Sequence, residues 1–362
     1  MHFQNCLVLL HVQSSIFKQN CQAKFSMIKD LIGLFANCWR MDRLIKLSKQ
    51  GLVLPFYHVV SNQDLIHIKH LYPVVSTQRF EADLDFLLKH YKPSSYPFLL
   101  NCIEDPSLRK EKMFYLTFDD GLREFHDVVA PILLRKGIPA TCFVNTGFID
   151  NKAMFFRMKA SILIETIAYK PLTKAQQNSI QQLFIKHSLS YQFAHDLLKI
   201  SDKNQSILDD IANILEVSFD DYLKTHQPYL TTNQIQNLIK QGFSIGAHSV
   251  SHPYFPDLSE DQQVEQVIDS MQFLHDNFQI TEKLFSFPYT DFDIGQSFFE
   301  KIRQEVDLTF GTANLKLDSI ATNFQRIPME IKNSKSASQI IKKAYALYII
   351  KMFMNKHIIE RS

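Results

Sequence analysis

The stretch Met113–Gly121, which reads MFYLTFDDG, decides the fold of this 362-residue chain. Its apolar and β-branched beginning is typical of a buried strand, and Asp119 and Asp120 mark the end of that strand. A helix is predicted over 124–135 and a second strand over 141–144. Short apolar strands joined by helices favour a parallel sheet or barrel, in which catalytic side chains collect at the carboxyl ends of the strands. The two aspartates lie at such an end.

The alternation of strands and helices is interrupted once, between 151 and 229, where stretches rich in Gln, Lys and Leu are typical of helices. Strand signals resume at 242–247, and an amphipathic helix is predicted over 260–277. We therefore expect an α/β fold with an inserted helical subdomain. The predicted segments are an N-terminal tail and helix (1–50), the first part of a barrel (51–150), the helical insertion (151–229), the second part of the barrel (230–335) and a C-terminal basic amphipathic helix (336–362).

Composition and charge exclude several classes of protein. With 39 basic and 37 acidic residues, the formal net charge is +2, which is not the charge of a nucleic-acid-binding protein. We therefore expect no nucleic-acid partner. The five cysteines are scattered without a Cys-x-x-Cys pair, which argues against a disulfide framework and against a zinc ribbon. Nothing in the sequence indicates an oligomeric state.

The two ends of the chain bear on membranes and location. No apolar run reaches the roughly 18 residues that a spanning helix needs, and the first 26 residues lack the features of a signal peptide. We expect a cytoplasmic protein in which residues 1–26 are a disordered tail or an over-long start. Segments 27–49 and 338–356 are basic and apolar at helical spacing. Each either makes a peripheral membrane contact or, like most amphipathic helices, packs on the protein core.

A second cluster at a predicted strand end contains His248 and His252. Histidines four residues apart can converge on one metal ion, although a chain with 14 histidines can contain such a pair by chance. The aspartate pair strengthens the metal interpretation, because two imidazoles and one carboxylate are a common ligand set for a hydrolytic divalent metal. Successive side chains on a strand diverge, so one aspartate can bind the metal while the other accepts a proton from water.

Three motifs follow one another along the chain: TFDDG at 117–121, GIPAT at 137–141 and HSVSH at 248–252. In residues, order and spacing they resemble the polysaccharide deacetylases with a NodB homology domain, which form carbohydrate esterase family 4. The resemblance covers about residues 52–150 and 230–330. It implies a distorted (β/α) barrel around one metal ion.

Carried over by position, the resemblance implies that Asp119 is the catalytic base. It implies that Asp120, His248 and His252 bind a divalent metal ion. Zinc suits two imidazoles and a carboxylate, and cobalt, nickel, manganese and iron are alternatives.

A further motif of the family, which comes after HSVSH in the chain, departs from the usual pattern. Where the family has arginine-x-proline-tyrosine, this chain has Ser286-Phe287-Pro288-Tyr289. The resemblance implies that the Tyr289 backbone N–H faces the developing oxyanion, but the cation that orients the base aspartate is missing from its usual place. Arg326, in the strand-like stretch QRIPME, is the candidate replacement, with a surface or structural role as the alternative.

The family's last motif, leucine-x-histidine, whose imidazole protonates the leaving amine, has no convincing equivalent. His357 lies in a basic tail after a predicted helix. Glu330, near a predicted strand end, could donate the proton if burial raised its pKa, and otherwise water or the substrate does so. His58, at the end of the strand predicted over 52–60, is either a group at the barrel mouth or a structural histidine.

The implied activity is that of a hydrolase acting on carbon–nitrogen bonds other than peptide bonds. The expected reaction is metal-dependent removal of an N-acetyl group from an amino sugar in a glycan, a saccharide precursor or a glycolipid. The missing arginine and histidine leave a catalytically silent glycan-binding protein as an alternative, and an O-acetyl esterase is another. Specificity is expected to depend on loops and on the 151–229 insertion.

Overall fold

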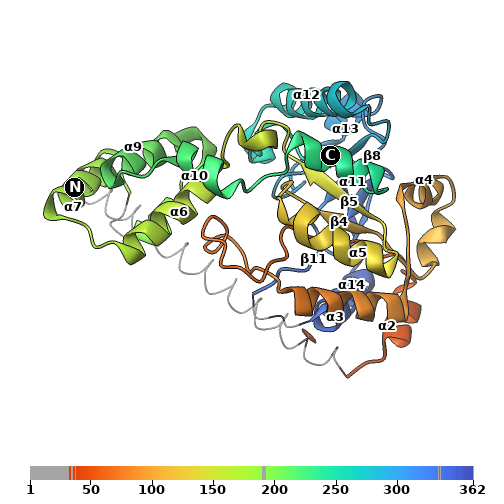
Figure 1. The fold of residues 1–362 in the computed structure, drawn as a ribbon. Helices are drawn as coiled ribbons and strands as arrows, with labels where there is room; N and C mark the ends of the chain where they lie inside the picture. The colour runs from red at the N-terminus through yellow and green to blue at the C-terminus, as the bar shows by residue number, and fades with distance from the viewer. Residues whose placement is uncertain are drawn as a thin grey trace, which may run out of the picture.

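A computed structural model describes residues 32–33, 36, 38–189, 193–332, 334 and 336–361. The tail predicted over 1–26 lies outside these residues. The main sheet has eight parallel strands in the order β10-β8-β7-β6-β5-β4-β1-β11, and Figure 1 shows it surrounded by helices. The strands are β1 (Pro55–Tyr57), β4 (Leu116–Phe118), β5 (Ala140–Val144), β6 (Ser244–Ala247), β7 (Leu284–Ser286), β8 (Leu308–Gly311), β10 (Asn323–Gln325) and β11 (Ile327–Pro328).

The two edge strands of this sheet are consecutive in the chain. β10 pairs with β8, β11 pairs with β1, and Arg326 alone separates β10 from β11. One extended segment therefore changes neighbours at a single residue, and the sheet closes into a (β/α) barrel. Every residue of β5 is buried, as expected for a parallel strand covered on both faces.

Helices cover the outside of the barrel. The longest of the outer helices begins with a capping box, in which the Ser259 hydroxyl accepts a hydrogen bond from the Gln262 N–H, and buries Val267, Met271 and Leu274 along one stripe. It confirms the helix predicted over 260–277. The outer helices are α2 (Met41–Ser48), α3 (Thr77–His90), α4 (Tyr96–Glu104), α5 (Ala130–Lys136), α11 (Thr232–Lys240), α12 (Glu260–Phe278), α13 (Gln296–Ile302) and α14 (Ala337–Phe353).

The run 113–118, predicted as one strand, is divided in the structure. β3 (Met113–Phe114) pairs with β2 (Lys92–Pro93), whereas β4 begins after Tyr115 and pairs with β1 and β5. The Tyr115 N–H donates to the Val53 carbonyl oxygen between the two ladders. The apolar run therefore changes strand partners at Tyr115, which hydrophobic patterning does not reveal.

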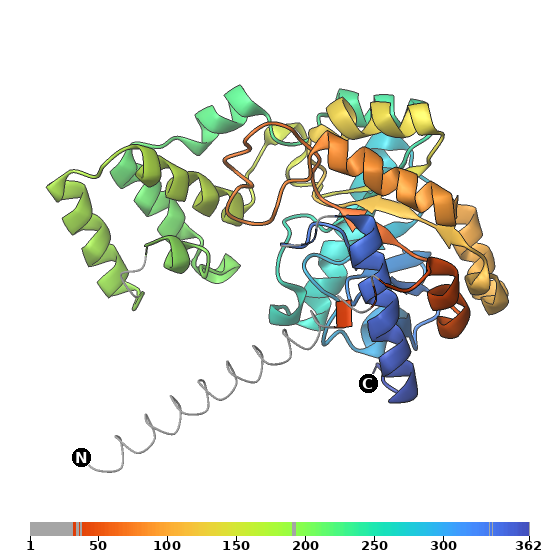
Figure 2. The ribbon, with the colours of Figure 1, turned by 90° about the horizontal axis from the view of Figure 1, so that it is seen from below.

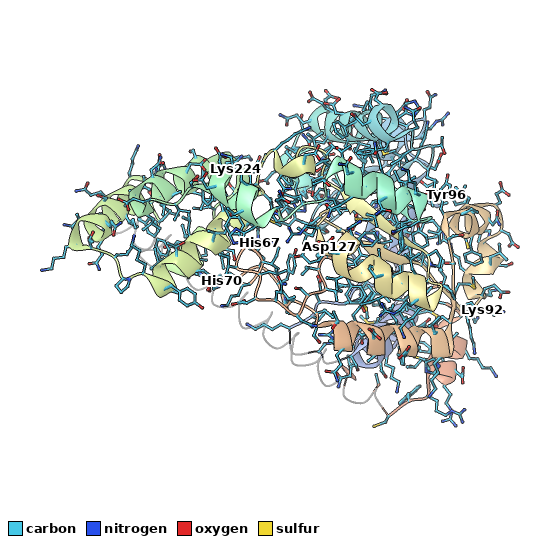
Figure 3. All side chains as sticks on the ribbon, viewed as in Figure 1. His67, His70, Lys92, Tyr96, Asp127 and Lys224 are labelled. Carbon is cyan, nitrogen blue, oxygen red and sulfur yellow. The ribbon has the colours of Figure 1, made fainter. Side chains whose placement is uncertain are left out.

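Five helices between β5 and β6 form a lobe beside the barrel (Figures 1 and 2). They bury their own apolar cluster, which includes Ile207, Leu208 and Ile211. The loop between β1 and α3 contacts this lobe through two histidines, which Figure 3 labels. The helices are α6 (Phe156–Tyr169), α7 (Lys174–Lys186), α8 (Phe193–Leu197), α9 (Ser206–Leu215) and α10 (Phe219–His226).

The histidines of this loop are paired with lobe residues. His67 Nδ1 lies 2.8 Å from the Tyr222 hydroxyl on α10, and His70 Nε2 lies 2.6 Å from a carboxylate oxygen of Glu165 on α6. Together with an ion pair of Lys69 and Glu165 at 3.2 Å and a hydrogen bond from the Ser161 hydroxyl to the Ile66 carbonyl oxygen, these contacts connect the barrel with the lobe on the side of the β1 loop.

The apolar stripe predicted in the C-terminal segment is largely buried. α14 packs against α2 and α3, with Ile340, Ile341 and Tyr345 buried. After it, β12 (Ile358–Ile359) pairs with β9 (Leu317–Asp318). Among the described residues, no helix has both the length and the apolar character needed to cross a membrane.

Candidate active site

Side chains that follow β1, β4, β6 and β7 surround a cavity of about 290 Å³ at the carboxyl ends of these strands. The structure thus brings five of the predicted site residues to one cavity, while Arg326 and Glu330 lie behind its wall. The lining residues are Phe56, His58, Leu71, Tyr72, Asp119, Asp120, Phe155, Arg157, His248, His252, Phe287, Tyr289 and Thr312.

The Asp119 carboxylate is held by Arg326. Because side chains alternate along a strand, Asp119 projects to the same side as Thr117, and Arg326 reaches both. Its Nη1 and Nη2 atoms lie 2.7 and 2.8 Å from the two carboxylate oxygens. The remaining donors reach the Thr117 hydroxyl (3.0 Å), the Ser286 hydroxyl (2.7 Å) and the Gly311 carbonyl oxygen (3.2 Å). All five N–H groups of the guanidinium therefore have acceptors.

This pairing keeps the buried Asp119 ionised. Burial alone would raise its pKa, but the Arg326 charge and further cationic neighbours outweigh burial and hold the pKa below its ordinary value. Arg326 is itself fully buried, with its guanidinium carbon 4.4 Å from the Phe56 ring centre. An ionised carboxylate facing the cavity is competent to accept a proton.

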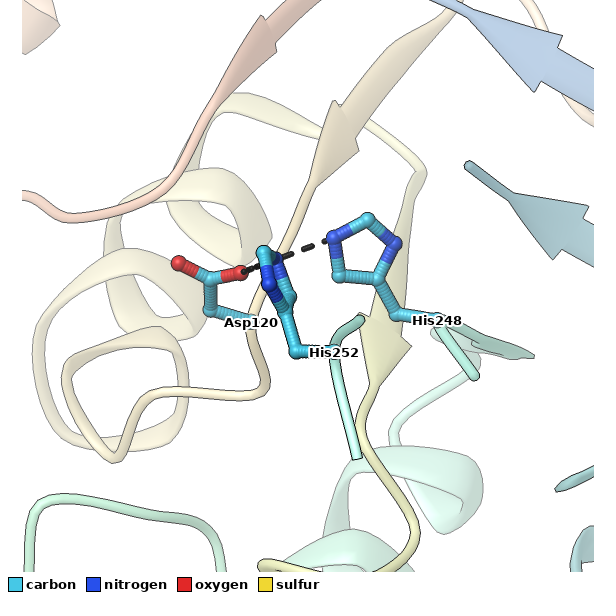
Figure 4. A group of neighbouring side chains, drawn as sticks. All are labelled: Asp120, His248 and His252. Carbon is cyan, nitrogen blue, oxygen red and sulfur yellow. Dashed lines mark ion pairs between the residues drawn. The ribbon is translucent and has the colours of Figure 1, made fainter. Parts of the chain in front are cut away.

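Asp120, His248 and His252 converge on one point (Figure 4). The Nε2 atoms of His248 and His252 lie 3.5 and 3.2 Å from Asp120 Oδ1. All three side chains are buried, and one potential ligand atom from each lies within 4.8 Å of the other two. Asp120 Oδ2 accepts a hydrogen bond from the Tyr72 hydroxyl at 3.1 Å, which fixes the carboxylate and leaves Oδ1 toward the imidazoles.

The hydrogen bonds of this group fit a bound cation. His248 Nδ1 donates to the Ser286 carbonyl oxygen at 2.8 Å, so its Nε2 presents a lone pair to Asp120. Burial lowers the pKa of His252, which favours its neutral form. Asp120 Oδ1 is buried and lacks a hydrogen-bond partner among the described residues. Lone pairs that face one another in a buried site need a positive charge between them, and two imidazoles with one carboxylate are suitable donors for a divalent metal.

The backbone is strained where it presents these side chains. Asp120 has φ 72°, Ser249 69°, His252 58° and Tyr289 57°. Left-handed conformations of residues other than glycine cost about 1–3 kcal/mol each and persist where the surrounding structure requires them. Four of them within one site indicate that the loops after β4, β6 and β7 are folded to aim their side chains.

A second ion pair, between His58 and Glu330, lies at the wall of the cavity. His58 Nδ1 makes a short contact with Glu330 Oε2, and Glu330 Oε1 accepts the backbone N–H groups of His58 (2.9 Å) and Val59 (2.8 Å). Burial would lower the pKa of His58, but the Glu330 carboxylate outweighs burial and raises the pKa to about 9. The imidazole stacks on Tyr72 with ring centres 4.5 Å apart. His58 faces the cavity as a cation, and Glu330 lies behind it.

Tyr289 closes a third side of the cavity. Its ring packs against His252 with centres 4.7 Å apart, and its carbonyl oxygen accepts from the Thr312 hydroxyl at 3.0 Å. Its backbone N–H makes no hydrogen bond within the described part of the chain. That donor is therefore available to a ligand, and its role toward the oxyanion stays a prediction.

Two cavity residues were difficult to find from the sequence. His58 carries a weak signal, since it lies at the end of a predicted strand, but its partner Glu330 lies 272 residues away. Arg157 carried none, because it belongs to the first turn of α6 in the insertion.

Comparisons with known proteins agree with this geometry. The family model described as Polysaccharide deacetylase matches residues 108–299, which is more than half of the chain. The Streptococcus pyogenes deacetylase PplD has a similar structure, with a TM-score of 0.52 and 16% identity over 81% of this chain and 97% of its own. IcaB from Ammonifex degensii gives a TM-score of 0.50 and 16% identity over 82% and 97%. At this identity the likeness shows the fold, a NodB-type (β/α) barrel. No curated protein matches the chain.

Proposed function

The chain belongs to the polysaccharide deacetylase family, and from this premise we propose that it is a metal-dependent hydrolase that removes the N-acetyl group of an amino sugar. The substrate is an acetylated glycan, a saccharide precursor or a glycolipid. The observation that carries the proposal is the ionised Asp119, held by Arg326, beside the buried group of Asp120, His248 and His252 in one cavity.

Each residue has a role in this proposal. Asp120, His248 and His252 hold a divalent cation, for which zinc suits the donors best. When bound there, such a cation would polarise the acetyl carbonyl and lower the pKa of a water molecule. Asp119 Oδ accepts the proton of the attacking water, and the Tyr289 N–H donates to the oxyanion.

The proton for the leaving amine comes from His58. The cavity wall presents its imidazole, and the Glu330 carboxylate raises the pKa of His58 to about 9, so the acid is charged at neutral pH. Glu330, the donor predicted from the sequence, has both carboxylate oxygens engaged by His58 and Val59. It therefore acts through His58. When the carbon–nitrogen bond breaks, the His58 proton passes to the amine nitrogen, and acetate and a free amino sugar leave.

The test combines metal analysis with acetate release from N-acetylated oligosaccharides. Wild type is expected to bind about one metal ion per chain and to release acetate. Asp119→Asn is expected to retain the metal and lose release, and His248→Ala/His252→Ala to lose both. Asp269→Asn, on the exposed side of α12, is the matched control and is expected to behave as wild type.

An O-acetylated sugar without an amide serves as the second substrate, because the same residues could act on an ester. Acetate release from the ester but not from the amide would show that the protein is an esterase and not an amidase. Release by Asp119→Asn at the wild-type rate, or a folded wild type that binds metal but cleaves neither substrate, would overturn the proposal.

A further inference from the structure

The helical insertion contributes a cation to the catalytic cavity. Phe155 and Arg157, at the beginning of α6, both line the cavity that contains Asp119 and the predicted metal ligands. The Phe155 ring packs on His252 with centres 4.5 Å apart. The Arg157 guanidinium carbon lies 5.0 Å from the Tyr289 ring centre. The insertion therefore forms one wall of the site, and a guanidinium lies in that wall.

The charge of Arg157 is not compensated by the protein. Within the described ranges no carboxylate oxygen lies within 4.0 Å of its guanidinium, and its Nε atom is buried without an acceptor. Asp202 influences the pKa of Tyr289 and so lies in this region, but its carboxylate accepts from Gln205 Nε2 at 2.9 Å. Among the described residues, Arg157 is left with uncharged neighbours: the Tyr289 side chain, through its ring face and a side-chain hydrogen bond, and the Phe156 ring, whose centre lies 5.9 Å from the guanidinium carbon.

The other cations of the site differ in this respect. The charge of Arg326 is matched by Asp119 and that of His58 by Glu330, each through contacts to both carboxylate oxygens. A guanidinium with free donors in a confined cavity is suited to a planar or tetrahedral anion, which it can bind through two parallel hydrogen bonds. The contact with Tyr289, through its ring and a side-chain hydrogen bond, orients the guanidinium and leaves other N–H groups, Nε among them, for an anion.

We propose that Arg157 is an anion-binding residue of the substrate site, and that the substrate carries an anionic group, a phosphate or a carboxylate, close to its acetylated amino sugar. The inference rests on the proposed function and narrows its substrate class. The insertion then sets specificity by selecting charged amino sugars over neutral ones.

The test compares three sugars that differ in one substituent: N-acetylglucosamine, N-acetylglucosamine 1-phosphate and N-acetylmuramic acid, which carries a carboxylate. Acetate release gives kcat/KM for each with wild type, Arg157→Lys and Arg157→Gln. Wild type is expected to favour at least one anionic sugar over the neutral one by tenfold or more, mainly through KM. In Arg157→Gln this ratio is expected to fall at least tenfold, and in Arg157→Lys to take an intermediate value. The preferred sugar identifies phosphate or carboxylate as the anion.

Arg135→Gln is the matched control, because this arginine is exposed on α5 and pairs with Glu81 far from the cavity. It is expected to keep the wild-type ratio. A wild type without preference for either anionic sugar overturns the inference. So does an Arg157→Gln variant that loses activity on all three sugars equally, because that result assigns Arg157 to the packing of Tyr289.

Binding measurements separate this inference from the proposed function. Calorimetry on Asp119→Asn, with and without Arg157→Gln, gives the affinity for the same three sugars without turnover. Tighter binding of an anionic sugar that depends on Arg157, together with a wild type that releases no acetate, would retain the anion site and reject the deacetylase. Equal affinities for the three sugars, or a preference that survives Arg157→Gln, would reject the anion site.

Discussion

Arg326 donates all five of its N–H groups, and it does so from the one position where the barrel closes. A cation at this position reaches Asp119 from inside the barrel, so the loop after β7 does not have to supply it. Ser286, at the end of β7, is small enough to leave room for the guanidinium and uses its hydroxyl as an acceptor at 2.7 Å. Arg326 therefore supplies, from another part of the fold, the cation that is lost where Ser286 replaces the family's arginine.

Substituting Arg326 by Met tests this compensation. The change leaves a buried carboxylate unpaired, and the free energy of unfolding is expected to fall by about 3–5 kcal/mol. Because Arg326 holds the pKa of Asp119 down, its removal raises that pKa, and the acid limb of the kcat/KM profile moves to higher pH. Denaturant unfolding and a pH–rate profile measure the two effects. Arg135→Met, on an exposed arginine, is the control, and an unmoved acid limb in Arg326→Met would contradict the assignment.

The pair of His58 and Glu330 predicts the pH at which kcat/KM declines on the alkaline side of the pH–rate profile. An acid with a pKa of about 9 is lost as the pH rises through 9, so kcat/KM should decline there. In Glu330→Gln the counter-charge is gone and burial dominates, so the pKa of His58 falls and the limb moves to lower pH. The pH–rate profile distinguishes two roles for Glu330. A limb that shifts makes Glu330 the partner of the acid, whereas lost activity at every pH would make Glu330 the acid itself.

The residues of the site differ in how far the sequence reveals them. Asp119, Asp120, His248 and His252 lie in two short motifs, each at the end of a predicted strand of a parallel sheet, so their convergence is expected although about 130 residues separate the motifs. The contact of His58 with Glu330 depends on the pairing of β1 with β11, in which Phe56 is opposite Pro328. That pairing forms only when the barrel closes, and no local pattern records it.

At the scale of elements, hydrophobic patterning finds the strands and helices but not their partners. The run 113–118 changes strand partners at Tyr115, which the pattern does not reveal. The helix predicted over 124–135 also differs from the pattern, in its helix type. Its first part, Phe125–Val129, is a π-helical turn, and α5 starts at Ala130. The π-helical turn follows directly on the loop that carries Asp120, where φ is positive at both Asp120 and Gly121. The constraint comes from the site, and amphipathic periodicity does not report it.

The insertion is expected to lose its structure separately from the barrel, because its helices share an apolar cluster distinct from the one around the sheet. Leu208 on α9 is fully buried in that cluster. Leu208→Ala is expected to cost about 2–5 kcal/mol of local stability and to increase amide hydrogen exchange in α6–α10. Exchange in β4–β8 should stay as in wild type. Ile185→Ala, on an exposed side chain of α7, is the control. Equal loss of protection in both regions would show one cooperative unit.

At the scale of the whole molecule, the C-terminal segment connects the barrel wall with the site. Arg361 follows β12 and lies between two buried carboxylates, with its Nη2 2.7 Å from Asp318 Oδ2 and in short contact with Asp291 Oδ2. Asp291 in turn accepts a hydrogen bond from Asn323 on β10 at 2.9 Å. Burial would raise the pKa of Asp291, but Arg361 and the neighbouring amides outweigh burial and lower it. One guanidinium thus joins the chain end, β9 and the loop after Tyr289.

Arg361 lies far along the chain from every motif, yet its contacts predict that its substitution lowers the free energy of unfolding strongly. Arg361→Met leaves the charges of Asp291 and Asp318 buried and unpaired, which is expected to cost about 3–5 kcal/mol. Lys301→Met is the matched control, since Lys301 also contacts two carboxylates, Glu260 and Asp261, but on the surface. Exposed pairs contribute about 0–1 kcal/mol, so this control should stay close to wild type in denaturant unfolding.

The pH dependence of the Arg361 effect gives the prediction a second measurement. A carboxylate whose pKa is lowered by folding contributes stability above its unfolded pKa of about 4 and loses it as the pH falls through the folded value. The stability difference between wild type and Arg361→Met should therefore be full at neutral pH and shrink in acid. An effect of Arg361→Met no larger than that of Lys301→Met, or a difference that stays constant down to about pH 3, would show that Arg361 packs as an apolar stem rather than as the counter-charge of Asp291.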